Sequence, residues 1–80
     1  MKNAGFDIIA QEVYYDDECK FGYAVGEKDN KYMPDGKEYV TWEFREENGV
    51  RDYYWGHYYS NRDTAFRDYH ERLYKEYKEE

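Results

Sequence analysis

Cysteine and proline are nearly absent from this sequence: Cys19 and Pro34 are the only residues of their kinds among 80. One cysteine excludes a disulfide framework, and no Cys/His cluster has the spacing of a zinc site. No apolar run approaches the ~20 residues of a membrane span, and the N-terminus lacks a signal-peptide core. We therefore expect one domain, residues 1–80, in a reducing cytoplasm, without a metal, another cofactor or a membrane.

Positive charge is also scarce. The net charge is −7, and residues 1–60 account for −6 of it, with 13 acidic and 7 basic side chains. An acidic surface repels phosphate, which argues against direct binding of nucleic acid. The same surface suits a basic protein partner. It is equally typical of a small domain that is simply kept soluble by its charge.

Aromatic residues are abundant, with twelve tyrosines, four phenylalanines and two tryptophans. A domain of this size has a thin stability margin, and large rings bury the most area per residue. Turn signals at 16–18, at Pro34-Asp35-Gly36 and at Asn48-Gly49 separate four strand-like runs. The sequence predicts an α+β fold: a four-stranded antiparallel meander with one C-terminal helix packed on one face. Its strands are expected at about 6–15, 20–27, 38–46 and 50–59, and its helix at about 61–77.

In the final twenty residues the spacing of apolar side chains changes from the alternation of a strand to the three- and four-residue steps of a helix. This spacing predicts the helix. Ser60 followed by Asp63 resembles a capping box. Acidic residues precede basic ones at i,i+4 in Asp63–Arg67, Asp68–Arg72 and Glu71–Lys75, which favours an exposed helix face. One apolar stripe has helical spacing and consists of Ala65, Phe66, Tyr69, Leu73 and Tyr77.

The hairpin around Asn48-Gly49 has a predictable register, in which the numbers of facing residues sum to 97. This register pairs Glu46 with Arg51 and aromatic rings with one another, as cross-strand energetics favours. The face predicted to lie under the helix consists of Val40, Trp42, Phe44, Tyr53, Trp55 and His57. The opposite face, predicted to stand in solvent and to bind a partner, consists of Tyr39, Thr41, Glu43, Tyr54, Gly56 and Tyr58. Gly56 would open a shallow trough between Tyr54 and Tyr58.

The first hairpin is less determined by its sequence. Phe21, Tyr23 and Val25 make one clear face of the second strand. In the first strand, Ile8 and Ala10 compete with Ile9 and Val13 for the core. The loop length across 16–18 decides between the two, so both registers stay open.

No residue pattern indicates catalysis, and we expect no catalytic residue. Cys19 and His57 have nothing that positions them as a dyad. Three acidic residues precede Cys19, whereas reactive cysteines lie in electropositive surroundings. We interpret His57 as a buried structural histidine and His70 as a partly exposed helix residue. The acidic run 16–18 lacks the spacing and glycine of an EF-hand loop.

The tyrosine-rich face has two interpretations. Tyrosine suits strands and tolerates solvent, so strand propensity alone would explain it. Tyrosine and tryptophan also carry binding energy at protein interfaces. An apolar patch rimmed by carboxylates fits a basic, partly apolar partner.

Two motifs and the helix that follows resemble a known group of proteins. The motifs are Tyr39-Val40-Thr41-Trp42 and Tyr54-Trp55-Gly56-His57-Tyr58, and the helix carries Ala65, Asp68 and Arg72. Together they resemble a small module of phages and conjugative elements of Firmicutes, and the resemblance starts near 6–9 and covers most of the chain. The loop at 29–36 is longer than in that module.

The resemblance implies an accessory protein that acts inside a bacterial host. Such proteins are often antagonists of host defence, including anti-CRISPR proteins, and some are acidic and imitate DNA. We therefore expect a non-catalytic binding protein that blocks a basic, nucleic-acid-binding host protein through its tyrosine-rich face. The alternative is an architectural or homodimeric module of a mobile-element protein without inhibitory activity.

Overall fold

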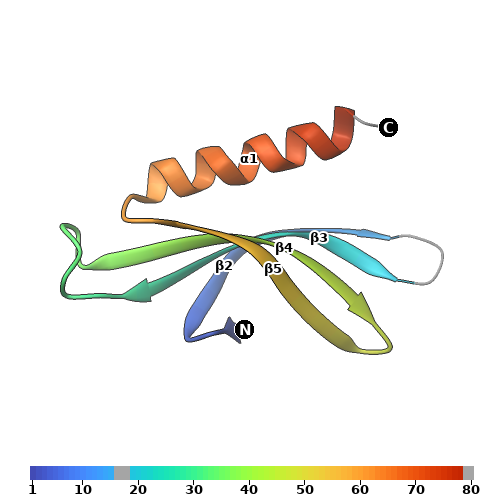
Figure 1. The fold of residues 1–80 in the computed structure, drawn as a ribbon, viewed down its shortest axis with the longest axis horizontal. Helices are drawn as coiled ribbons and strands as arrows, with labels where there is room; N and C mark the ends of the chain where they lie inside the picture. Colours follow the sequence, from blue (N-terminus) through green and yellow to red (C-terminus); the bar gives the residue numbers. More distant parts are fainter. Residues whose placement is uncertain (16–18, 79–80) are drawn as a thin grey trace.

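A computed structural model describes residues 1–15 and 19–78, with helix side chains up to residue 75, and shows an α+β fold (Figure 1). One antiparallel sheet has the order β1-β2-β3-β4-β5, and a single helix follows it. The predicted fold class is therefore correct, but the sheet has five strands instead of four. The turn predicted at 16–18 lies outside the described residues. The elements are β1 (Lys2–Asn3), β2 (Phe6–Tyr15), β3 (Lys20–Asp29), β4 (Lys37–Glu47), β5 (Val50–Tyr59) and α1 (Arg62–Lys78).

The strand that the sequence did not predict is β1, which pairs with the start of β2. Its turn is formed by Ala4 and Gly5, with φ angles of 51° and 86°. Both angles are positive, as a type I′ hairpin turn requires, but alanine is not a usual residue for that conformation. The two-residue strand covers part of the outer edge of β2.

The β4–β5 turn forms as predicted. Asn48 and Gly49 have φ angles of 52° and 79°, the signature of a type I′ hairpin turn. Beyond the turn the predicted register is confirmed from Glu47 opposite Val50 to Glu43 opposite Tyr54. The predicted pair of Glu46 and Arg51 makes a hydrogen bond of 2.8 Å.

The same register is wrong further from the turn. Between Thr41 and Glu43 the pairing shifts by one residue, so that Trp55 and Gly56 of β5 lie opposite the single residue Trp42. This is a β-bulge, which bends a strand and increases its twist. A second irregularity lies in β2, where Ile9 is skipped between Ile8 and Ala10.

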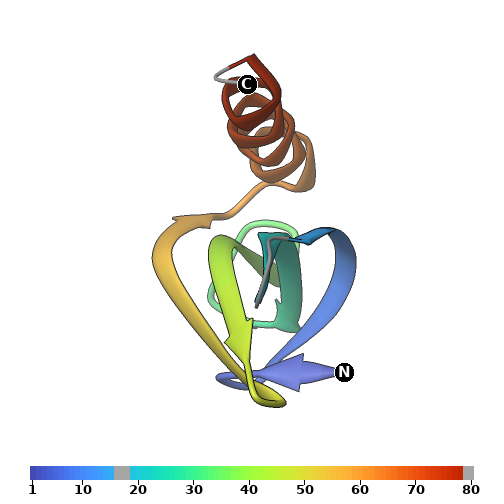
Figure 2. The same ribbon diagram turned by 90° about the vertical axis from the view of Figure 1, so that its right-hand side faces the viewer.

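Strands β2 and β5 therefore both bend, and the sheet curls until they approach each other (Figure 2). Their side chains meet across the gap: the rings of Phe6 and Tyr58 are 6.2 Å apart. Arg51 Nη1 donates to Gln11 Oε1 at 2.8 Å, and its guanidinium lies 4.1 Å from the Phe44 ring centre. The concave face thus closes over its own side chains. This inner core consists of Phe6, Ala24, Val40, Trp42 and Phe44, with Ile8, Val13 and Tyr53 at its margin.

The helix covers the opposite, convex face (Figure 2). The helix-side core consists of Tyr23, Val25, Tyr39, Ala65 and Tyr69, with Ile9, Ala10, Tyr14, Tyr59, Phe66 and Leu73 at its margin. The predicted helix stripe is confirmed up to Leu73, whereas the side chain of Tyr77 lies outside the described part. The prediction that α1 covers Val40, Trp42, Phe44 and Tyr53 is wrong, because the curl already buries that face.

The two registers left open for the first hairpin are reconciled by the bulge at Ile9. Ile8 and Val13 pack against the inner core, whereas Ile9 and Ala10 pack on the helix side. Neither predicted pair shares a face, because the skipped residue reverses the alternation of side chains within β2.

The N-cap of the helix lies one residue later than predicted. Asn61 is the N-cap: its Oδ1 accepts from the backbone N–H of Thr64 at 3.1 Å, and its carbonyl accepts from Ala65. Ser60 is therefore not the capping residue. Asparagine is among the most favourable N-cap residues, since its side chain satisfies an orphan donor of the first turn.

We predict that Phe44→Ala lowers the free energy of unfolding by ~3–5 kcal/mol, because Phe44 is fully buried in the inner core and its loss leaves a cavity. Tyr32→Ala is the control, since Tyr32 is 84% exposed and a surface change usually stays within ~0.5 kcal/mol. Urea melts of both variants measure the difference. Equal midpoints would contradict the assignment of the concave face as a core.

Candidate functional site

The six residues predicted to form one solvent-facing surface are separated by the fold. Tyr39 and Thr41 are only 6% and 0% exposed, because α1 lies over them. Glu43 and Tyr54 are half-buried. Gly56 and Tyr58 are exposed, but the bulge turns them to the inner-core side. The predicted tyrosine trough therefore does not exist as one surface.

Gly56 nevertheless has a clear local role. A Cβ at this position would lie 3.2 Å from Trp42 Nε1 and 3.5 Å from a ring carbon of Tyr58. The missing side chain therefore lets β5 pass close to the Trp42 indole. A larger residue here would press on the inner core instead of filling an open trough.

Trp55 was predicted to be a core residue, and that prediction is wrong. Its side chain is 71% exposed, and its φ angle is 56°. A bulge of this kind usually places glycine at the left-handed position, whereas this chain places tryptophan there and glycine next to it. The left-handed conformation costs a non-glycine residue roughly 1–2 kcal/mol. The exposed indole returns little burial energy to offset that cost.

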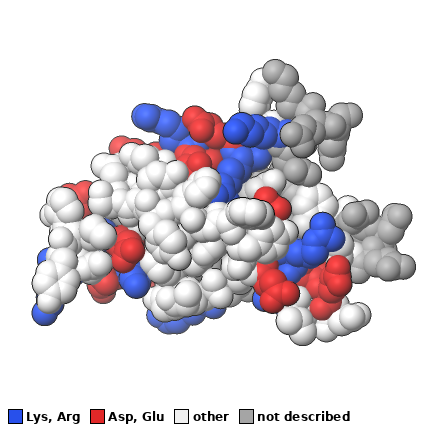
Figure 3. Space-filling model, in the orientation of Figure 1, with Lys and Arg blue, Asp and Glu red and all other residues white. Residues whose placement is uncertain are grey.

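Residues 55–58 form the exposed segment of the edge strand, and we refer to them as the 55–58 surface. They are Trp55, Gly56, His57 and Tyr58, and all four are exposed. The whole stretch 53–61 contains no Asp, Glu, Lys or Arg. Figure 3 shows the result: the middle of the face that carries β5 is uncharged, and charged side chains gather over α1 and near the β4–β5 turn.

A polar cluster lies directly behind this surface, between β5 and α1. Asp68 Oδ2 accepts from Thr41 Oγ1 at 2.5 Å and lies 3.1 Å from His57 Nδ1. Arg72 Nε is 3.3 Å from the same oxygen, and Arg72 Nη2 donates to the Trp55 carbonyl at 2.5 Å. The predicted Asp68–Arg72 pair thus forms, but it faces the sheet instead of solvent.

The electrostatics of the cluster follow from these contacts. Burial raises the pKa of Asp68, but the hydrogen bonds of Thr41 and His57 and the charge of Arg72 outweigh it and hold the pKa below its ordinary value. His57 is a half-exposed partner of Asp68, with 53% of its side chain accessible, and not the buried residue that the sequence predicted. The pair resembles part of a catalytic triad, yet Thr41 is fully buried and donates to the carboxylate, so it is not placed to attack a substrate.

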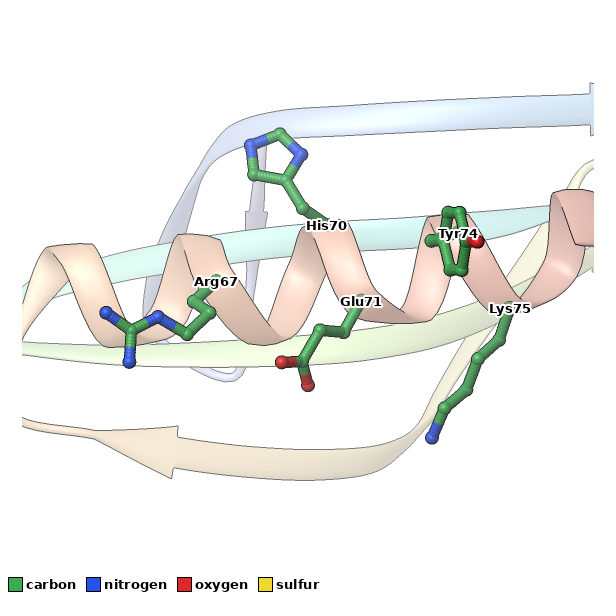
Figure 4. A pocket seen from close by; sticks show the side chains of 5 residues that line it. All are labelled: Arg67, His70, Glu71, Tyr74 and Lys75. Atoms are coloured by element: carbon green, nitrogen blue, oxygen red, sulfur yellow. The ribbon is translucent and has the colours of Figure 1, made fainter.

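Two other features, the Cys19 thiol and a hollow on α1, lie outside this cluster. Cys19 is half-buried, and its sulfur lies 3.4 Å from Arg45 Nη1. A shallow hollow on the outer face of α1 is lined by Arg67, His70, Glu71, Tyr74 and Lys75, and Figure 4 shows these side chains projecting from successive turns of the helix. All of the lining comes from one helix, so the hollow is open helix surface and not an enclosed site.

Within the described residues, no three His, Cys, Asp or Glu side chains are grouped to hold a metal ion. Among the same residues, no helix is long and apolar enough to cross a membrane. Comparison with known proteins gives no match, whether with protein-family models, with curated proteins or with solved structures. The sequence resemblance to a mobile-element module is therefore neither supported nor refuted.

We predict that Trp55→Asn leaves the protein as stable as the wild type or stabilises it by up to ~1 kcal/mol. Asparagine tolerates the left-handed conformation better than tryptophan, and little burial is lost. Thermal melts of Trp55→Asn and of Tyr58→Asn as a neighbouring control measure this. A loss of several kcal/mol in Trp55→Asn would show that the indole is a structural residue.

The lowered pKa of Asp68 predicts an acid-labile contribution to stability. A depressed carboxyl pKa stabilises the fold above the ordinary value near 3.8, and this stability is lost as pH falls through the lower, folded value. Asp68→Asn should lower stability at pH 7 and should flatten the decline below about pH 4. Asp35→Asn, in the exposed loop, is the control. An unchanged acid slope in Asp68→Asn would contradict the role of this carboxylate.

Proposed function

We propose that this protein is a non-catalytic binding module that contacts a basic protein through the 55–58 surface. The observation that carries the proposal is Trp55, a tryptophan in a left-handed conformation with 71% of its side chain exposed. Non-glycine residues in that conformation cluster at functional sites, where the surrounding structure holds them. Tryptophan is also among the residue types enriched at the anchors of protein interfaces.

The basic character of the partner follows from charge. The chain carries −7 overall, which attracts a basic surface and repels another copy of itself. Its own cations already lie over other rings, such as Lys28 at 4.6 Å from the Phe6 centre and Arg51 over Phe44. Within the part of the chain that the structure describes, none lies over Trp55. An arginine or lysine of the partner would therefore find this indole open to a cation–π contact.

The resemblance to mobile-element proteins supplies the biological setting of the proposal. In that setting the partner is a host defence or nucleic-acid-processing protein inside a bacterium, and binding blocks its access to nucleic acid. Such a partner is expected to carry a basic surface, because it binds the phosphates of nucleic acid. The charge of this chain therefore agrees with what the resemblance implies, although it does not identify the partner.

The alternative is a homodimeric or architectural module. The 55–58 surface lies on an edge strand, and edge strands are the usual place for pairing with another chain. The bulge interrupts the regular ladder there, however, and the net charge opposes self-association. Sedimentation of the purified protein at several concentrations distinguishes a homodimer from a module that binds another protein. A dimer that the Trp55→Asn substitution dissociates into monomers would favour the homodimeric alternative.

We predict that Trp55→Asn weakens partner binding by ~2 kcal/mol or more, about thirtyfold, while the control Tyr32→Asn binds like the wild type. The three proteins are immobilised and used to capture partners from a bacterial lysate, and the affinity of the purified partner is then measured. The on-rate should also fall clearly as the salt concentration rises from about 0.05 to 0.5 M. A basic partner held equally by all three proteins would refute the 55–58 surface.

A further inference from the structure

We propose that Arg72 and Asp68 of α1 are positioning residues that hold Trp55 in its exposed conformation, so that docking of the helix controls how the indole is presented. The structural part of this inference stands on the contacts of the bulge alone. Its consequence for binding rests on the proposed function.

The Trp55 carbonyl lies at the bulge. In a bulge the extra residue is left out of the strand ladder, and the register from Thr41 to Glu43 gives Trp55 no facing residue of its own. Its carbonyl is therefore available to a donor from outside the sheet. Arg72 Nη2 supplies that donor at 2.5 Å, from a helix that begins after β5 ends.

Arg72 is itself held in place by Asp68. Its Nε lies 3.3 Å from Asp68 Oδ2, one helical turn earlier, and the two side chains are only 12% and 17% exposed. The same Asp68 oxygen accepts from Thr41 on β4 and contacts His57 on β5. Thr41 precedes the bulge on β4 and His57 follows it on β5. Because the strands are antiparallel, the two residues face each other on the same side of the bulge. The cluster thus fixes both strands around the irregularity.

Arg72 is more than a counter-ion for Asp68. A counter-ion needs one favourable contact, yet Arg72 also buries Nη1 without a hydrogen-bond partner among the described residues. Burying an unpaired donor is unfavourable. The orientation of the guanidinium is therefore explained by its second contact, the one with the Trp55 carbonyl. A shorter or more flexible cation would satisfy Asp68 without reaching the bulge.

The competing arrangement is a regular β4–β5 register without the bulge. In it the numbers of facing residues continue to sum to 97, and Trp55 pairs with Trp42. Side chains in that register alternate without interruption, so the indole would turn to the inner face and Thr41 would face Gly56. The cluster opposes this slip, because it places His57 opposite Thr41 on the helix side. Loss of the cluster is thus expected to let the bulge open locally while the rest of the sheet stays folded.

The test compares Arg72→Gln with Arg67→Gln, a control on the outer face of the same helix. Hydrogen exchange of backbone amides, read by NMR, gives the local opening of the bulge. We expect Arg72→Gln to speed exchange at residues 55–57 at least tenfold, and at Ala24 and Val25 of the central strand less than threefold. The control should change neither. Arg72→Lys should give the same pattern, and it replaces Arg72→Gln if the latter does not fold.

The decisive comparison repeats the substitution in a Trp55→Gly background. Glycine adopts a positive φ without support, so Arg72→Gln should then speed exchange at 55–57 less than threefold. Uniform acceleration across the sheet, or the same tenfold effect with Gly at 55, would overturn the proposal, because either marks Arg72 as a purely structural residue. If Trp55→Asn leaves partner binding intact, the proposed function fails, but the exchange result still decides the role of Arg72.

Discussion

The packing of the buried Trp42 side chain under β5 is the interaction on which the arrangement of the two sheet faces depends. Trp42 is buried in the inner core, with its ring edge-on to Phe6 at 5.6 Å and near Tyr53 at 5.2 Å. A strand crossing over an indole of this size leaves little room for a side chain directly above it, and Gly56 supplies the gap. The residue before the glycine is then turned outward. The exposed tryptophan is thus a geometric consequence of the buried one.

The bulges also determine how this sheet meets other chains. Natural sheets protect their edges with bulges, charges or covering elements, because an open ladder recruits further strands. Here β2 and β5 both carry a bulge, and β1 covers the start of β2. A partner that adds a regular strand to β5 would meet an interrupted ladder whose Trp55 carbonyl is already bonded to Arg72. Recognition through side chains is the more favourable mode at this edge.

The sequence predicted what short-range chemistry decides. The Asn48-Gly49 turn, the charge pair of Glu46 and Arg51 and the apolar stripe of α1 all form, since each depends on residues close together in the chain. The short strand β1 was missed, because an Ala4-Gly5 turn has only one of the two residues that such turns favour. Its two-residue length leaves no alternation to detect.

The candidate site was less predictable, because it depends on long-range packing. Assigning one face to the helix and the other to solvent assumed a flat sheet, whereas a curled sheet buries both faces. A glycine inside a strand often marks a bulge, and Gly56 was the one local signal for the position of Trp55. From the sequence, the Asp68–Arg72 pair, which faces the sheet, could not be distinguished from solvent-exposed pairs. The i,i+4 spacing is the same on every side of a helix.

The two tryptophans differ so strongly in exposure, 4% for Trp42 and 71% for Trp55, that they make the protein its own optical reporter. Indole emission shifts to longer wavelength in water, and soluble quenchers reach an exposed ring far more readily than a buried one. Emission at the red edge of the spectrum therefore follows Trp55 and the blue edge follows Trp42. Events at the sheet edge and events in the inner core are consequently distinguishable in one unlabelled sample.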